Sequence, residues 1–143
     1  MARQRQSRRL RAAGLAGSVV LDSGALTAAA AGDPRVRAEL SVAEQLGVEV
    51  HVSSVTLAEV LRGHARDARV HALLAGVEHD PVTPTLGRTA GELLGHTRRD
   101  DTVDAIVAVT ADGLDKPVRL LTGDPVDLRA LASDMPGVTV IAI

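Results

Sequence analysis

Short apolar runs alternate along the chain with longer segments of helical periodicity. The first run, Val19-Val20-Leu21, ends at Asp22 and predicts a buried strand. Four further segments are short and apolar or rich in β-branched residues, and they predict strands at residues 48–52, 76–82, 118–122 and 138–143. The chain is therefore expected to contain about five strands.

The segments between these strands have the spacing and the end signals of helices. Residues 35–46 place apolar side chains three or four positions apart, and Gly47 follows as a typical C-terminal cap. Further helices are predicted at residues 24–31, 56–61, 66–74, 86–96, 102–111 and 127–132. Strands that alternate with helices predict an α/β fold, in which a mostly parallel sheet is covered on both faces.

Composition limits the chemistry of the chain, because its 143 residues include no Cys, Phe, Trp or Tyr. This length suits one domain. Without Cys there are no disulfides, thiolate zinc sites or cysteine nucleophiles. Without aromatic rings there is no base stacking, so a nucleic acid would be held through phosphate, metal and arginine.

Charge is distributed unevenly along the chain. Residues 1–11 carry five arginines and no acid, whereas the rest carries 18 acidic against 11 basic residues. Lys116 is the only lysine, which removes Schiff-base chemistry and phosphate loops that need a lysine. Asp22 interrupts the apolar run at 12–21, so we interpret residues 1–18 as a basic, disordered arm rather than a secretory signal. With no long apolar stretch, no membrane span is predicted, and a cytoplasmic location is expected.

Four acidic residues are expected to meet at the carboxyl edge of the sheet. Asp22 and Asp124 follow the first and fourth predicted strands. Glu59 is placed in the first turn of the helix after the second strand, and Asp104 lies early in the helix at 102–111. Gathered carboxylates repel one another, and a bound cation relieves that repulsion. Oxygen ligands without Cys favour Mg²⁺, with Mn²⁺ as the alternative.

Each of these acids also fits an ordinary structural role. Thr56 and Glu59 match a capping box, and Asp124 before Pro125 matches a helix start. Asp22 has the weakest explanation of this kind, because a carboxylate that ends an apolar strand is not by itself a capping signal. The placement of all four at one edge favours a shared site over separate coincidences.

Four segments in order resemble the PIN-domain ribonucleases, and most closely the VapC toxins of toxin–antitoxin pairs. They are residues 19–23, 53–60, 101–108 and 121–128. The order and spacing agree across residues 19–143, whereas residues 1–18 lie outside the resemblance. It implies a PIN-like domain over 19–143, with three α/β/α layers around a mostly parallel sheet of four or five strands.

The resemblance assigns Asp22, Glu59, Asp104 and Asp124 to an acidic metal site. The three aspartates are the first choices as ligands of Mg²⁺ or Mn²⁺. Glu59 is expected to bind the metal directly or through water, and to orient the attacking water.

Two further acids and one departure complete this expected site. Asp127 is a more variable family position, and Asp101 is near enough to assist. Gly123 stands where the family often has a serine, so a hydroxyl beside Asp124 is absent and the positioning of Asp124 is expected to be weaker.

The resemblance also implies an activity and partners. The activity is that of an endoribonuclease toxin, which cleaves structured RNA of the tRNA or rRNA class by metal-activated water. Positive charge for the RNA backbone would come from arginines, with Arg62, Arg66, Arg98 and Arg99 as candidates.

The implied protein partners are a cognate antitoxin and a second copy of the chain. A family antitoxin lays a helix and an extended segment over its toxin. Four apolar residues of the early helices are candidates for that contact surface, namely Leu26, Leu40, Val60 and Leu61. Ordinary core packing is the alternative role for all four.

Other functions are less consistent with the sequence. A haloacid-dehalogenase-type phosphatase needs a second acid two residues after Asp22, where Gly24 stands. A receiver domain needs an acidic pair and a late lysine that are missing. The five histidines lack metal-ligand spacing. The open alternative is a non-catalytic PIN fold that binds RNA or a protein.

Overall fold

The computed structural model describes residues 2, 5 and 17–143 and contains a central five-stranded sheet. The strands are β1 Ser18–Leu21, β2 Glu49–Ser53, β3 Glu78–Asp80, β4 Val118–Thr122 and β5 Val138–Ala142. Their order is β3-β2-β1-β4-β5, and every neighbouring pair is parallel. Because parallel strands start at the same edge, the chain crosses back through helices between them.

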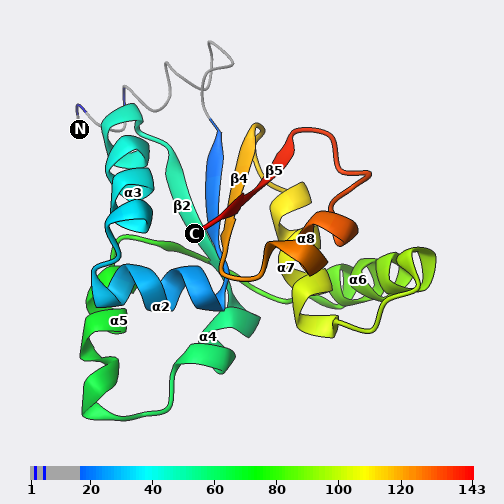
Figure 1. The fold of residues 1–143 in the computed structure, drawn as a ribbon, viewed down its shortest axis with the longest axis horizontal. Helices are drawn as coiled ribbons and strands as arrows, with labels where there is room; N and C mark the ends of the chain where they lie inside the picture. Colours follow the sequence, from blue (N-terminus) through cyan, green and yellow to red (C-terminus); the bar gives the residue numbers. More distant parts are fainter. Residues whose placement is uncertain (1, 3–4, 6–16) are drawn as a thin grey trace.

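Seven α-helices occur in the described part of the chain. They are α2 Ser23–Ala31, α3 Pro34–Leu46, α4 Ser54–Val60, α5 Ala68–Leu74, α6 Pro84–Thr97, α7 Thr102–Asp112 and α8 Pro125–Leu131. Figure 1 shows α2, α3 and α5 on one side of the sheet, and α6, α7 and α8 on the other.

The side chains of β1 point alternately to the two faces of the sheet, which explains why helices cover both faces. Val19 and Leu21 pack into a cluster with Leu26 of α2, whereas Val20 packs into a second cluster with Leu120 and Leu128. Successive strand residues point to opposite faces, so a wholly apolar strand supplies a core on both. The predicted three-layer α/β/α architecture with a parallel sheet is therefore confirmed, with five strands.

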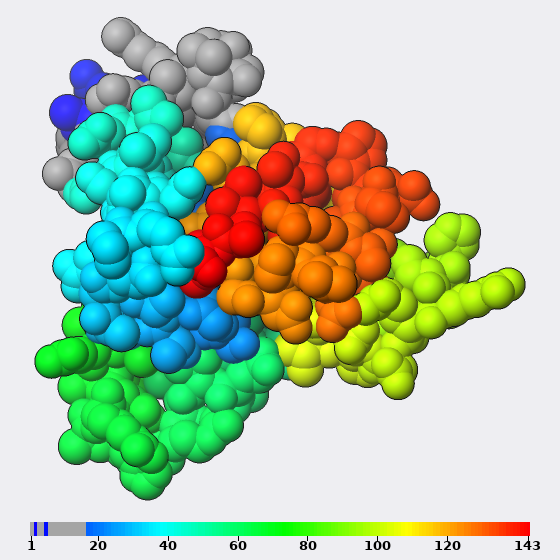
Figure 2. Space-filling model, viewed as in Figure 1, coloured from blue at the N-terminus to red at the C-terminus, as the bar shows by residue number. Residues whose placement is uncertain are grey.

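Small residues replace aromatic rings inside these layers. Alanines 25, 29 and 43 are buried under one face, and alanines 105, 108 and 111 under the other. A helix with alanine at its contact face can approach the sheet closely. By contrast, α6 buries only Ala90, and Figure 2 shows this yellow-green helix extending beyond the rest of the molecule.

The predicted elements are all present, with shifted boundaries. The weak strand at 76–82 shortens to β3, and the helix at 66–74 divides into a 3₁₀ turn, Ala65–Asp67, followed by α5. Helix α4 begins two residues earlier than predicted, at Ser54, because the Ser53 hydroxyl accepts a hydrogen bond from the Val55 N–H at 3.3 Å. The predicted capping box at Thr56 is therefore wrong, and Thr56 is instead buried within the helix.

The predicted basic arm, residues 1–18, lies almost wholly outside the described residues. Of these, residues 2, 5, 17 and 18 are described, and Ser18 already belongs to β1. Within the described residues, no helix combines the length and the apolar character that a bilayer crossing requires.

Candidate metal centre

Asp22 lies where β1 passes into α2 and is fixed by several hydrogen bonds. Its Oδ1 accepts from the Ala25 N–H at 2.8 Å as the cap of α2, and its own N–H donates to the Leu121 carbonyl at 3.1 Å. The Thr122 hydroxyl donates to Asp22 Oδ2. Burial raises the pKa of Asp22 despite these hydrogen bonds, which favour the charged form. Asp22, a residue only 8% exposed, thus has its carboxylate held in place at an electrostatic cost.

Thr122 connects Asp22 to Asp124. The Thr122 hydroxyl oxygen also accepts a hydrogen bond from the Asp124 N–H at 2.9 Å, so one fully buried hydroxyl contacts both residues. A Cβ added at Gly24 would meet the Gly123 backbone nitrogen at 3.3 Å. This close approach between the first turn of α2 and the segment after β4 explains glycine at position 24.

Sequence reasoning missed the role of Thr122. The available signal was a polar residue on the same strand face as the core residue Leu120, at the point where β4 ends. The missing hydroxyl at Gly123 was expected to weaken the positioning of Asp124. The structure shows a hydroxyl one residue earlier that anchors the Asp124 backbone.

Asp104 gathers with two acids that the sequence had placed second in rank. One carboxylate oxygen from each of Asp101, Asp104 and Asp127 lies within 4.8 Å of the others. Burial is the main cause that raises the pKa of Asp104 to about 6. Four neighbouring carboxylates add to this rise, in decreasing order Asp101, Asp127, Asp22 and Asp124. The five aspartates, hereafter the aspartate cluster, are therefore linked electrostatically through Asp104.

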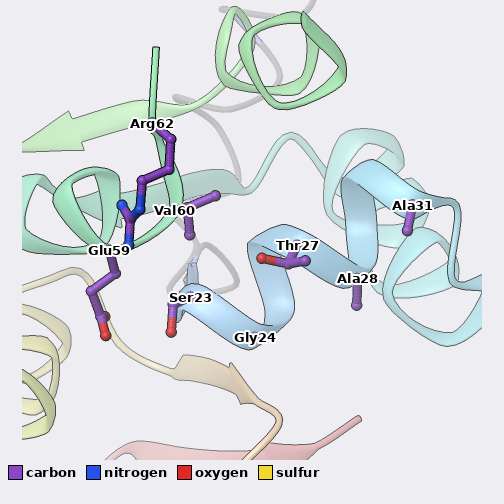
Figure 3. Close-up of a pocket in the computed structure, with 8 residues that line it drawn as sticks. All are labelled: Ser23, Gly24, Thr27, Ala28, Ala31, Glu59, Val60 and Arg62. Atoms are coloured by element: carbon purple, nitrogen blue, oxygen red, sulfur yellow. The ribbon is translucent and has the colours of Figure 1, made fainter. Parts of the chain in front are cut away.

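Glu59 stands apart from the aspartate cluster. Its prediction in the first turn of a helix is wrong: α4 begins at Ser54, so Glu59 lies in the last turn and is exposed. It lines a groove of about 590 Å³ between α4 and α2, hereafter the α2–α4 groove. Figure 3 shows Glu59 and Arg62 on one wall, and Ser23, Gly24, Thr27, Ala28 and Ala31 along α2 on the other.

The α2–α4 groove nevertheless adjoins the aspartate cluster. Ser23 and Gly24, which line it, directly follow Asp22 in the chain. Glu59 is not among the carboxylates that raise the pKa of Asp104. Its participation in metal binding stays a prediction.

Comparison with known proteins identifies the family of the chain. A family model described as PIN domain matches residues 19–131, most of the chain. The chain belongs to the PIN-domain family. A comparison with curated proteins found no match.

Three solved structures share the PIN fold of this chain. VapBC2 from Rickettsia felis, bound to a promoter DNA fragment, is 14% identical with a TM-score of 0.67, covering 88% of this chain and 98% of that one. A toxin–antitoxin complex from Klebsiella pneumoniae is 19% identical with a TM-score of 0.67, covering 87% and 99%. VapBC-5 from Mycobacterium tuberculosis is 20% identical with a TM-score of 0.54, covering 89% and 99%.

The donor atoms of this PIN domain suit a divalent cation. Asp101, Asp104 and Asp127 offer only carboxylate oxygens, the ligands that Mg²⁺ and Mn²⁺ prefer. The three are half-buried, so a cation has access from solvent. Within the described residues, this is the group of acids with the spacing for a metal ion.

Arg99 supplies positive charge to the same cluster. Its Nε lies 3.3 Å from Asp101 Oδ2, and its terminal nitrogen contacts Asp127 Oδ1. The sequence had proposed Arg99 only as a contact for the RNA backbone. Its position two residues before Asp101 was the available signal for the second role.

The apolar surface expected around α2 needs one correction. Leu26 is fully buried in the core beneath α2, so it cannot contact a partner. Leu40, Val60 and Leu61 are half-buried and pack against the same core. Among them, Val60 also lines the α2–α4 groove.

Proposed function

We propose that this PIN-domain chain is a Mg²⁺-dependent endoribonuclease, with Mn²⁺ as an alternative ion, and the toxin of a toxin–antitoxin pair. The observation that carries the proposal is the aspartate cluster at the carboxyl edge of the parallel sheet. Ligands of open α/β sheets bind at this edge. Four carboxylates that add to the raised pKa of Asp104 have little structural benefit without a cation.

Different acidic residues of the chain have different roles in the proposed phosphodiester hydrolysis. Asp101, Asp104 and Asp127 would hold the ion, and Asp22 and Asp124 would extend the negative site on the side fixed by Thr122. A bound divalent ion supplies an activated water and stabilises charge on the scissile phosphate. Glu59, on the neighbouring groove wall, orients the attacking water from outside the cluster.

The proposed substrate is structured cellular RNA of the tRNA or rRNA class. The chain has no aromatic ring for base stacking, so recognition rests on phosphate contacts. Arg62 lies at the α2–α4 groove, and its guanidinium donates to the Ala58 and Leu61 carbonyls at 2.9 and 2.8 Å. These bonds hold its charge beside the path of an RNA backbone.

An antitoxin is the proposed protein partner. The structural neighbours from R. felis and M. tuberculosis are VapBC toxin–antitoxin assemblies. The α2–α4 groove offers apolar lining at Ala28, Ala31 and Val60, next to Glu59 and the start of α2. A segment bound there would cover the approach to the aspartate cluster. A cytoplasmic homodimer completes the proposal.

RNA cleavage tests the proposed activity. Purified protein is incubated with a panel of tRNA and rRNA fragments in Mg²⁺ or in EDTA, and the 5′ ends of products are mapped. Cleavage is expected only in Mg²⁺ and is expected to disappear in Asp104→Asn. The matched control, Asp100→Asn, changes an exposed neighbour and should cleave like the wild type. Identical cleavage by wild type and Asp104→Asn contradicts the proposal, and RNA binding without cleavage favours the non-catalytic alternative.

A further inference from the structure

Arg99 is placed at the aspartate cluster by the way α6 ends. Arg98, which caps α6, has φ 55°, a left-handed conformation that turns the chain out of the helix. The Arg99 N–H then donates to the Leu94 carbonyl at 3.1 Å. The backbone therefore fixes the position from which the Arg99 side chain extends, next to the start of α7.

The Arg99 guanidinium spans two elements of the cluster. It contacts Asp101, at the N-cap position of α7, and Asp127, in the first turn of α8. The three side chains are 27–33% exposed, so the contact is partly shielded from water. Shielding strengthens the attraction relative to a surface ion pair.

The same two carboxylates belong to the candidate metal centre. Asp101 and Asp127, together with Asp104, offer the oxygens that lie within 4.8 Å of one another. A carboxylate oxygen that faces a guanidinium is a poorer ligand for a divalent cation, since two positive charges at close range repel each other. Asp104 has no basic partner among the described residues, so Arg99 leaves part of the cluster's negative charge unbalanced.

We propose that Arg99 is a built-in counter-ion that competes with the divalent metal for Asp101 and Asp127. In the metal-free protein it holds α7 and α8 together across the cluster. With a metal bound, the guanidinium would give up these carboxylates and remain at the edge of the site. Arg99 is thus a positioning residue, and this inference rests on the proposed function.

Mn²⁺ binding tests the competition without any measurement of activity. Wild type, Arg99→Gln and Arg99→Lys are titrated with MnCl₂ by calorimetry, after circular dichroism has confirmed that each is folded. We expect Arg99→Gln to bind Mn²⁺ about ten-fold more tightly, because a positive charge close to the ion is removed. Arg99→Lys should lie nearer to the wild type. Arg98→Gln, which removes the neighbouring positive charge, should change affinity much less.

Thermal unfolding provides a second readout. In EDTA, Arg99→Gln should unfold at a lower temperature than wild type, and saturating Mn²⁺ should raise its midpoint by more than it raises that of wild type. A simple loss of structure would weaken metal binding, whereas the proposal predicts that it becomes tighter.

The outcomes separate this inference from the proposed function. Equal or weaker Mn²⁺ binding by folded Arg99→Gln, with binding by wild type intact, overturns the competition and leaves the nuclease proposal standing. Absence of Mn²⁺ binding in both proteins overturns both proposals. Binding by Arg99→Gln alone supports the competition in its strongest form.

Discussion

The aspartate cluster and the α2–α4 groove adjoin each other but are built in different ways. In the cluster, Asp22 and Asp124 follow strands and are held by backbone bonds and by the Thr122 hydroxyl. In the groove, Glu59 is an exposed side chain in the last turn of a short helix. The cluster is therefore preorganised before any ligand arrives, whereas Glu59 retains rotational freedom. We infer that the cluster binds the metal and that the groove contributes to substrate and partner binding.

The substitution Asp22→Asn is expected to have the largest effect, and it separates the charge of Asp22 from its role as the cap of α2. Asparagine caps helices about as well as aspartate, so Asp22→Asn removes the charge and keeps α2. We expect RNA cleavage to fall at least about 100-fold, since even residues that only support metal ligands cost 10–100-fold.

Asp33→Asn is the matched control for this change. Asp33 caps α3 through hydrogen bonds from the Arg35 and Val36 N–H groups at 2.9 and 3.3 Å, outside the cluster. The Asp33→Asn variant should cleave the same RNA at the initial rate of the wild type. An equal loss in the two variants would mean that helix capping, and not the metal site, explains the effect.

Thr122→Val tests the preorganisation of the cluster. The substitution keeps the shape but leaves the Asp124 N–H and Asp22 Oδ2 without their buried partner, which costs about 1–3 kcal/mol of unfolding free energy. Urea titration in EDTA measures the loss. Thr122→Ser retains the hydroxyl and should recover most of it; a Ser variant as unstable as Val would show that the methyl group, not the hydrogen bonds, matters.

Glu59→Gln tests whether the α2–α4 groove, unlike the aspartate cluster, contributes to cleavage without binding the metal. We expect cleavage to fall by about 10-fold, the range for a residue that acts through another ligand or water. Mn²⁺ affinity, measured by calorimetry, should stay within two-fold of wild type. A loss of affinity as large as that in Asp104→Asn would place Glu59 among the metal ligands and abolish the distinction.

The raised pKa of Asp104 predicts a pH dependence of stability. Its pKa is about 6 in the folded protein and near 3.8 when unfolded, so the folded state binds the proton more tightly. Stability in EDTA should therefore fall as the pH rises from 4 to 6, by about 1 kcal/mol after allowance for solvent screening. Asp104→Asn should remove this part of the slope in urea titrations; an unchanged slope would exclude Asp104 as its source.

The smallest expected effect concerns the end of α6. Arg98 adopts a left-handed conformation that costs an L-residue more than glycine. Arg98→Gly should raise the unfolding free energy by about 0.5–1 kcal/mol. Mn²⁺ affinity should be unchanged, because Arg98 does not contact the cluster carboxylates. A destabilised variant would indicate that the Arg98 side chain contributes contacts beyond the cap.

The location of Asp22 and Asp124 was predictable because the ends of the preceding strands could be read from the sequence. The apolar run before Asp22 and the strand before Asp124 each end close to their predicted positions, so parallel pairing brings both residues to one edge. Glu59 was misplaced because the predicted cap of its helix, Thr56, lies three residues after the observed cap, Ser53, or about 4.5 Å along the axis. The reason is local: Ser53 and Thr56 are both plausible caps, and the sequence alone does not choose between them.

Contacts between distant side chains were beyond prediction from the sequence. Arg99 and Asp127 are 28 positions apart and meet only because α7 and α8 pack side by side. Thr122 and Asp22 are 100 positions apart and meet through the pairing of β1 with β4. Sequence patterns thus locate the elements, whereas the packing of the elements determines which charges neutralise one another.

Anomalous X-ray scattering from Mn²⁺-soaked crystals tests the central claim most directly. The account predicts a strong peak bounded by Asp101, Asp104 and Asp127, which is absent in Asp104→Asn crystals soaked in the same way. A peak in the α2–α4 groove beside Glu59, or no peak at either place, would contradict the assignment of the aspartate cluster as the metal centre.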